Sequence, residues 1–202
     1  IFFDNPGGTQ VVGSVIDAVT DYYRSRCANV GGAFVTSNRT DETVAAARQA
    51  MADLLGAPDP YTIVFGPSMT NLTFHLARSI GRTIKPGDEI IVTELDHDAN
   101  VTPWRDLEAL GAVIRTIPFD TTTGTLDTQA FADALVPGKT RLMAVSMISN
   151  ALGTVLPVAE LIAMAKSVNA KVLLDAAQAV SHQPIDVTAL DCDFLCFSGH
   201  KL

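Results

Sequence analysis

The chain has 202 residues, of which 48% are hydrophobic and 18% are charged, so its composition excludes a disordered chain and suits one domain with a substantial core. Its formal net charge of −8 at pH 7 disfavours nucleic acid and anionic membrane surfaces as partners, because both are negatively charged. The three cysteines (Cys27, Cys192 and Cys196) lack the spacing of a zinc site, and with no signal peptide before them they favour a reducing cytoplasm.

Helical and strand-like patterns alternate along the chain. The patterns predict helices at 11–26, 41–55, 68–80, 101–110, 128–135 and 158–168, and strands at 61–65, 89–92, 112–117, 141–146, 171–174 and 193–197. This alternation is typical of an α/β fold with a mainly parallel central sheet flanked by helices. No internal linker suggests a second domain, so we expect residues 1–202 to form a single domain. In such folds ligands bind beyond the carboxyl ends of the strands.

The first candidate functional segment, residues 64–71, is interpreted as a strand, a glycine-containing turn and the start of a helix. The free N–H groups at a helix N-terminus bind phosphate, and the hydroxyl of Ser68 or Thr70 could add a contact. A simpler alternative is that Ser68 only caps the helix. No Walker loop and no GxGxxG pattern follows a predicted strand, which disfavours a nucleotide-binding α/β domain.

Two further polar segments follow predicted strands. His97 lies in the segment 93–100, where an imidazole could stack on a flat ring or transfer a proton; the alternative is a solvated loop histidine. Asn150 follows the strand at 141–146 and could donate a hydrogen bond to a cofactor oxygen; the alternative is a turn asparagine.

The last two predicted strands end in a carboxylate and an amine. The apolar run 171–174 leads directly to Asp175, which alone could equally cap a helix or bind a metal. The final strand leads to Ser198-Gly-His-Lys201, where a lysine alone could be an ordinary surface residue. Together, the two strand ends can bring a carboxylate and an amine into one crevice. Pyridoxal 5'-phosphate requires this pair: the amine forms a Schiff base with its aldehyde, and the carboxylate keeps its pyridine nitrogen protonated.

At these residues the chain resembles the class V aminotransferases that depend on pyridoxal phosphate, in particular the cysteine desulfurases and selenocysteine lyases. The segments that carry the resemblance are HDANVTPW (97–104), SNALGTVLPVAEL (149–161), DAAQAVSHQPIDV (175–187) and DCDFLCFSGHKL (191–202), with a looser match over 64–78. The resemblance implies the large domain of fold type I, with the family's C-terminal small domain absent from this chain.

The resemblance also implies a role for each matched residue. Lys201 would hold the cofactor as a Schiff base and Asp175 would pair with the pyridine nitrogen. Gln178 would hydrogen-bond the phenolic oxygen, His97 would stack on the ring and assist proton transfer, and Asn150 would lie near the Schiff base. The implied phosphate contacts are the Met69 backbone, Thr70, Ser198 and His200.

The function implied is that of an enzyme acting on an amino acid, with removal of sulfur from L-cysteine first among the alternatives. Other class V reactions (an aminotransferase, an epimerase or a β-lyase) and a non-catalytic protein of the same fold remain open. The resemblance further implies a cytoplasmic homodimer with no metal. None of the three cysteines matches the family's nucleophile, so we read the chain as part of a longer protein.

Overall fold

The computed structural model describes residues 7–202, which form two compact units. The first contains the described residues up to Phe65 together with Pro184–Thr188. The second contains Gly66–Gln183 and Ala189–Leu202. Every candidate cofactor-binding residue belongs to the second unit, so the candidate site can be described within it.

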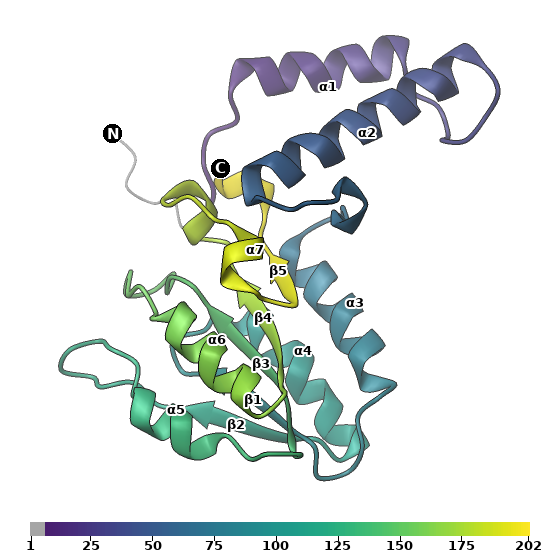
Figure 1. The fold of residues 1–202 in the computed structure, drawn as a ribbon. Coiled ribbons are helices and arrows are strands. Elements are labelled where there is room, and N and C mark those ends of the chain that lie inside the picture. Colours follow the sequence, from purple (N-terminus) through teal and green to yellow (C-terminus); the bar gives the residue numbers. More distant parts are fainter. Residues whose placement is uncertain (1–6) are drawn as a thin grey trace. The chain divides into compact units, whose positions relative to one another are not determined.

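Two helices make up most of the first unit: α1 (Gly13–Ser25) and α2 (Val35–Leu55), drawn in purple and blue in Figure 1. The start of α2 lies at Val35, ahead of the predicted start at residue 41. The buried hydroxyls of Ser37 and Thr40 explain the difference. They donate hydrogen bonds of 2.7 and 2.9 Å to backbone carbonyl oxygens ahead of the helix, which anchors its first turns.

The predicted strand at 61–65 is wrong. The segment begins instead with a 3-10 turn, η2 (Pro60–Thr62), whose preceding residue Asp59 accepts a 2.8 Å hydrogen bond from the Tyr61 backbone. Proline fixes its own φ near the helical value, and an aspartate before it caps the turn. The apolar side chains after the turn do not create a strand, because a strand also needs a hydrogen-bonded neighbour.

The second unit is built around a fully parallel five-stranded sheet of order β2-β1-β3-β4-β5. The strands are β1 (Glu89–Thr93), β2 (Val113–Ile117), β3 (Thr140–Ser146), β4 (Lys171–Asp175) and β5 (Phe194–Cys196). The α/β prediction is therefore confirmed, with each of these strands close to its predicted range. Because all five strands are parallel, their carboxyl ends meet at one edge of the sheet.

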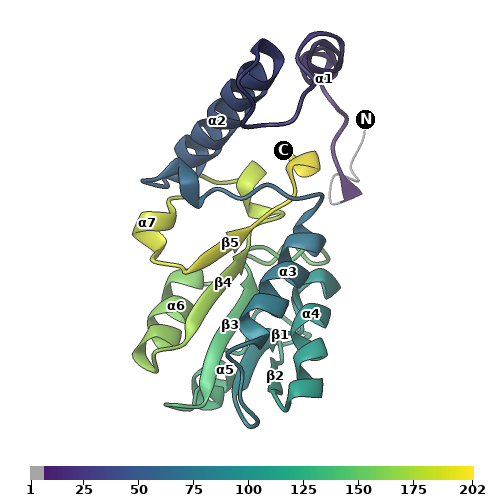
Figure 2. The ribbon, with the colours of Figure 1, turned by 90° about the vertical axis from the view of Figure 1, so that its right-hand side faces the viewer.

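Helices cover both faces of this sheet. Figure 1 and Figure 2 show α5 (Thr128–Ala134) and α6 (Val158–Ser167) on one face and α3 (Met69–Gly81) and α4 (Thr102–Arg105) on the other. The predicted helix at 101–110 is α4 followed by a 3-10 segment, η4 (Asp106–Leu110). Short elements that the patterns did not predict are η3 (Asp98–Asn100), η5 (Ala179–Ser181), α7 (Val187–Leu190) and η6 (Gly199–Lys201).

The core of the second unit lies between the sheet and α3 and α4. Ile90, Val92, Leu142 and Leu173 point into it from three neighbouring strands, and Trp104 of α4 packs against them with its side chain fully buried. These strands are buried on both faces, as the uninterrupted apolar runs in the sequence predict. No helix within residues 7–202 is both long enough and apolar enough to cross a membrane.

Candidate functional site

The carboxyl ends of β4 and β5 bring the two most informative segments of the sequence together. Asp175, the last residue of β4, lies opposite Cys196, the last residue of β5. The Ala176 backbone N–H donates a 2.8 Å hydrogen bond to the Cys196 carbonyl oxygen, so the strands stay paired to their ends. The chain then turns through Ser198 into η6, which ends at Lys201. Asp175 and Lys201 therefore lie at the same edge of the sheet.

Asp175 is a buried carboxylate, with only 4% of its surface exposed. Its pKa is raised to about 6, chiefly by burial and in smaller part by the negative charge of Asp96. A 2.8 Å hydrogen bond from the Ala177 backbone N–H and the positive charge of Lys201 act in the opposite direction. A cationic group placed against this carboxylate would favour its ionised form.

Gln178 lies one turn beyond Asp175, directly before η5. Its side chain is buried, and among the described residues its Nε2 has no hydrogen-bond partner. A buried amide donor without a partner is costly, so this nitrogen is poised for an acceptor supplied by a bound molecule.

The first turn of α3 meets the segment after β5. The Met69 backbone N–H donates to Ser198 Oγ at 3.1 Å, and the Asn71 N–H donates to Ser68 Oγ at 3.2 Å. Thr70 lies between them with its side chain exposed. Ser68 therefore does cap the helix, as the simpler alternative required. The same turn also offers the N–H groups and the positive end of the helix dipole that suit a phosphate.

His97 lies in the turn after β1, directly before η3, with its ring exposed. Its Nδ1 accepts a 3.1 Å hydrogen bond from the Ala99 backbone N–H. A ring nitrogen that accepts carries no proton, so the ring proton lies on Nε2, which is a donor. The local turn thus orients the imidazole and selects its tautomer.

The two remaining candidates lie in segments that follow β3 and β5. Asn150 lies half-buried in the turn after β3, the turn in which the Gly153 N–H donates to the Ser149 carbonyl oxygen at 2.9 Å. His200 is exposed in η6 between Gly199 and Lys201. Both lie at the carboxyl edge of the sheet, because each follows a strand directly.

One polar group that the sequence reasoning missed is Asp96, the residue before His97. Its carboxylate accepts hydrogen bonds from Thr93 and Asn100 on its own turn and from Ser146 at the end of β3. The sequence did hold a hint of this contact. Ser146 is the last residue of the predicted strand at 141–146, and Asp96 lies just after the predicted strand at 89–92. Only the sheet order β1-β3 shows that they meet.

The three cysteines lie in different environments. Cys27 is exposed in the first unit, whereas Cys192 and Cys196 are partly buried. Burial, with a further contribution from the charge of Asp175, raises the pKa of Cys196 to about 11. A thiol with this pKa is protonated near neutral pH and is a poor nucleophile.

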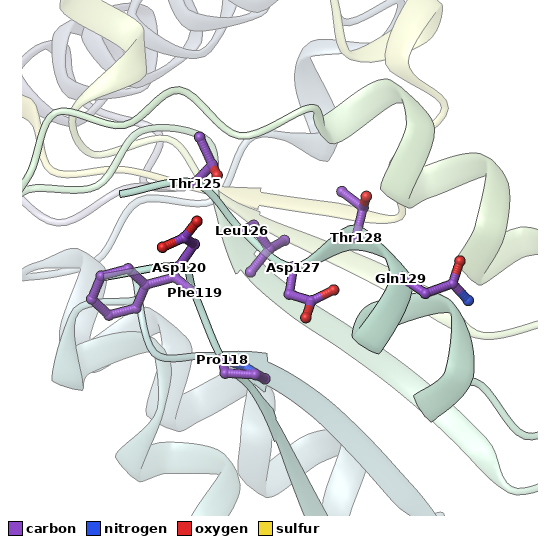
Figure 3. A pocket seen from close by; sticks show the side chains of 8 residues that line it. All are labelled: Pro118, Phe119, Asp120, Thr125, Leu126, Asp127, Thr128 and Gln129. Carbon is purple, nitrogen blue, oxygen red and sulfur yellow. The ribbon is translucent and has the colours of Figure 1, made fainter. Parts of the chain in front are cut away.

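A pocket of about 390 Å³ lies beyond the carboxyl end of β2, the outer strand on the side of the sheet away from β5. Figure 3 shows the side chains that line it, which come from the strand end and the start of α5: Pro118, Phe119, Asp120, Thr125, Leu126, Asp127, Thr128 and Gln129. Its two carboxylates accept local backbone hydrogen bonds, Asp120 from Thr122 and Asp127 from Ala130. They therefore serve the turn and the helix cap, and the pocket holds none of the predicted site residues.

Comparison with known proteins gives one consistent picture. The family Aminotransferase class-V matches residues 1–202. A cysteine desulfurase of Pectobacterium atrosepticum is 42% identical over 204 residues, covering 100% of this chain and 50% of the relative, and one of Yersinia pestis is also 42% identical. The chain thus spans about half the length of the curated relatives it matches.

Solved structures agree. A cysteine desulfurase of Thermococcus onnurineus has a TM-score of 0.92 at 33% identity, covering 99% of this chain and 50% of its own. One from Escherichia coli has a TM-score of 0.86 at 32% identity, covering 98% and 50%.

Proposed function

The chain belongs to the class-V aminotransferase family, and on this basis we propose that residues 1–202 form the cofactor-binding large domain of a pyridoxal 5'-phosphate enzyme that removes sulfur from L-cysteine. The observation that carries the proposal is the placement of Asp175 and Lys201 at the carboxyl ends of adjacent strands. The 42% identity to cysteine desulfurases supports this reaction over other reactions of the family.

The polar groups at this edge fit the cofactor. Asp175 is a buried carboxylate whose negative charge suits a protonated pyridine nitrogen. Gln178 Nε2 is a buried donor without an acceptor among the described residues, so it can donate to an acceptor such as a phenolic oxygen. The Met69 backbone and Ser198, already joined by a hydrogen bond, begin a phosphate cradle at the start of α3. We assign Thr70 and His200 to the rim of this cradle and Asn150 to the side near Lys201.

When bound, pyridoxal 5'-phosphate supplies an electron sink for a carbanion at the substrate α-carbon. The Lys201 amine would hold the cofactor covalently and, when free, would act as the base for the proton on the substrate α-carbon. Asp175 keeps the ring nitrogen cationic by its negative charge. His97 would stack on the cofactor ring, and in the tautomer that the Ala99 contact selects its Nε2–H is a hydrogen-bond donor.

The acceptor of the sulfur lies outside the groups described above. None of the three cysteines matches the family's nucleophile, and Cys192 and Cys196 are partly buried, the latter with a pKa raised to about 11. We therefore propose that the half of the relatives' length that this chain does not span provides the nucleophilic thiol. We also propose that the whole protein acts as a homodimer in the cytoplasm.

The experiment that tests the function has two steps. The protein is mixed with pyridoxal 5'-phosphate and reduced with borohydride, and the modified peptide is identified by mass spectrometry. We expect a yellow band that is lost on reduction and a cofactor mass on the peptide containing Lys201. Alanine and sulfide are then measured after addition of L-cysteine and a thiol reductant to the whole protein, which includes the half that this chain does not span, with other amino acids as competitors. Turnover of another amino acid in preference to cysteine would favour an aminotransferase, epimerase or β-lyase, and covalent binding without any turnover would favour the non-catalytic alternative.

A further inference from the structure

Asp96 has the most heavily bonded side chain in the vicinity of the site, although the proposed function gives it no role. Its Oδ2 accepts from the Thr93 backbone N–H at 2.8 Å and from Thr93 Oγ1 at 2.7 Å. Its Oδ1 accepts from Asn100 Nδ2 at 3.1 Å, from Ser146 Oγ at 2.7 Å and from the Ser146 backbone N–H. Both oxygens therefore accept hydrogen bonds from the surrounding chain.

These bonds join parts of the chain that are far apart in the sequence. Thr93 ends β1, Asn100 lies in η3, and Ser146 ends β3, so one carboxylate ties the turn that carries His97 to the neighbouring strand. Ser146 in turn lies opposite Asp175 in the register of β3 with β4. The next backbone N–H, that of Met147, donates to the Asp175 carbonyl oxygen at 2.9 Å. A continuous set of bonds therefore runs from the His97 turn to Asp175.

Holding a carboxylate here is unfavourable in itself. Burial raises the pKa of Asp96, while the hydrogen bonds from Ser146, Thr93 and Asn100 lower it. A second carboxylate, Asp175, lies close enough for the two negative charges to interact. Two nearby anions repel each other unless a cation or several donors compensate for them. Apolar side chains would fill the same space without this penalty.

We propose that Asp96 is a positioning residue of the candidate site, which holds the His97 turn against the end of β3 and so fixes His97 relative to Asp175. The proposal rests on the proposed function, because that function assigns His97 and Asp175 to the same cofactor. This role requires no contact between Asp96 and the substrate or cofactor.

The test compares Asp96→Asn with Asp98→Asn, both in the chain without cofactor. Asp98 is a matched control because it is an exposed aspartate in the same turn, bonded through its side chain to Thr102 Oγ1 at 2.6 Å. Two quantities are measured by NMR: the titration midpoint of the Asp175 carboxyl carbon and the tautomer of His97 from its ring nitrogen shifts. Both readouts are taken under conditions in which the variants are folded, because unfolding would itself lower the Asp175 midpoint.

We expect Asp96→Asn to lower the Asp175 midpoint, because one of the charges that raise its pKa is removed. The other titratable groups facing Asp175 are Cys196 on β5 and Lys201 in η6, and neither is altered. The loosened turn should also convert His97 from one tautomer to a mixture. Asp98→Asn should change neither. An unchanged midpoint and tautomer in Asp96→Asn, or equal changes in both variants, would overturn the proposal.

If Asp96→Asn does not fold, the unaltered chain still decides the question. Two interacting carboxylates titrate as a coupled pair, so the Asp175 signal should show a second inflection where Asp96 titrates. A single inflection would count against the proposal. Cofactor uptake by the unaltered chain is measured separately. Its failure would remove the proposed function, whereas the titrations, made without cofactor, test Asp96 alone.

Discussion

Ser198 Oγ accepts a 3.1 Å hydrogen bond from the backbone N–H of Met69, although the two residues are 129 positions apart in the sequence. The bond joins the first residue of α3 to the segment that follows β5. It therefore unites the two motifs to which the phosphate contacts were assigned.

Replacement of Ser198 by alanine should weaken cofactor binding. A hydrogen bond to a charged group contributes about 1.5–3 kcal/mol, which corresponds to roughly ten- to a hundredfold in affinity. The dissociation constant of pyridoxal 5'-phosphate, measured by absorbance titration, should rise by that factor. Ser79→Ala is the control, since the Ser79 hydroxyl donates to the His75 carbonyl oxygen on the exposed side of the same helix. Equal effects of both substitutions would contradict the assignment of Ser198.

Lys201→Ala should abolish covalent attachment of the cofactor. Only a side-chain amine at this position can form the bond that borohydride reduces, so no cofactor mass should be found on any peptide of the variant. Lys139→Ala, which removes an exposed lysine from the turn before β3, should retain the adduct. A reduced adduct on Lys201→Ala protein would show that another lysine carries the cofactor.

Asp175→Asn should stabilise the chain without cofactor, and only above acidic pH. Because the pKa of Asp175 is raised from 3.8 in the unfolded chain to about 6 in the folded state, the folded state holds its proton more tightly. The free energy of unfolding therefore falls as pH rises from about 4 to 6, by up to ~3 kcal/mol. The Asp175→Asn variant has no carboxyl group to titrate at this position, so its free energy of unfolding should not show this fall.

Urea unfolding at pH 8 and at pH 4 checks this prediction. We expect the Asp175→Asn variant to be more stable by about 1–3 kcal/mol at pH 8 and to match the unaltered chain at pH 4. Glu108→Gln, at an exposed carboxylate of η4, serves as the control and should show no such difference. A variant that is less stable at pH 8 would mean that Asp175 is held by contacts stronger than its burial penalty.

Gln178→Met should separate cofactor binding from folding. The substitution removes a buried amide nitrogen that has no partner among the described residues and keeps a side chain of similar length. The free energy of unfolding without cofactor should stay the same or rise by about 1 kcal/mol, while cofactor affinity should fall. Gln129→Met, at an exposed position, should leave the affinity unchanged. A large loss of stability in Gln178→Met would make Gln178 a structural residue.

The three cysteines should react at very different rates in the folded chain. Cys27 is exposed, and the pKa of Cys196 is raised to about 11, so the Cys196 thiolate is scarce at pH 8. Iodoacetamide followed by peptide mass spectrometry should find Cys27 modified first and Cys196 protected. All three should react in urea. Rapid modification of Cys196 in the folded chain would be incompatible with its burial.

Much of the fold was predictable because apolar periodicity and turn residues act locally. The α/β class, the five strands of the sheet and the resemblance to class V aminotransferases were all inferred from the sequence and are confirmed. The strand predicted at 61–65 was wrong, because a strand exists only where a neighbour pairs with it, and pairing is not a local property. The early start of α2 at Val35 depends in the same way on hydroxyl contacts to the preceding loop.

The candidate site also has features that the sequence predicts and features that depend on tertiary contacts. The sequence alone singled out the residues that we propose to carry the chemistry, since Asp175 and Lys201 each follow an apolar strand and match a family motif. The tertiary structure alone decided what surrounds them: the raised pKa of Asp175, the unpartnered Gln178 amide and the Asp96 network across β1 and β3. The physical reason is that burial, charge interactions and hydrogen bonds between strands depend on which segments become neighbours, and strand order is set by the packing of the whole sheet.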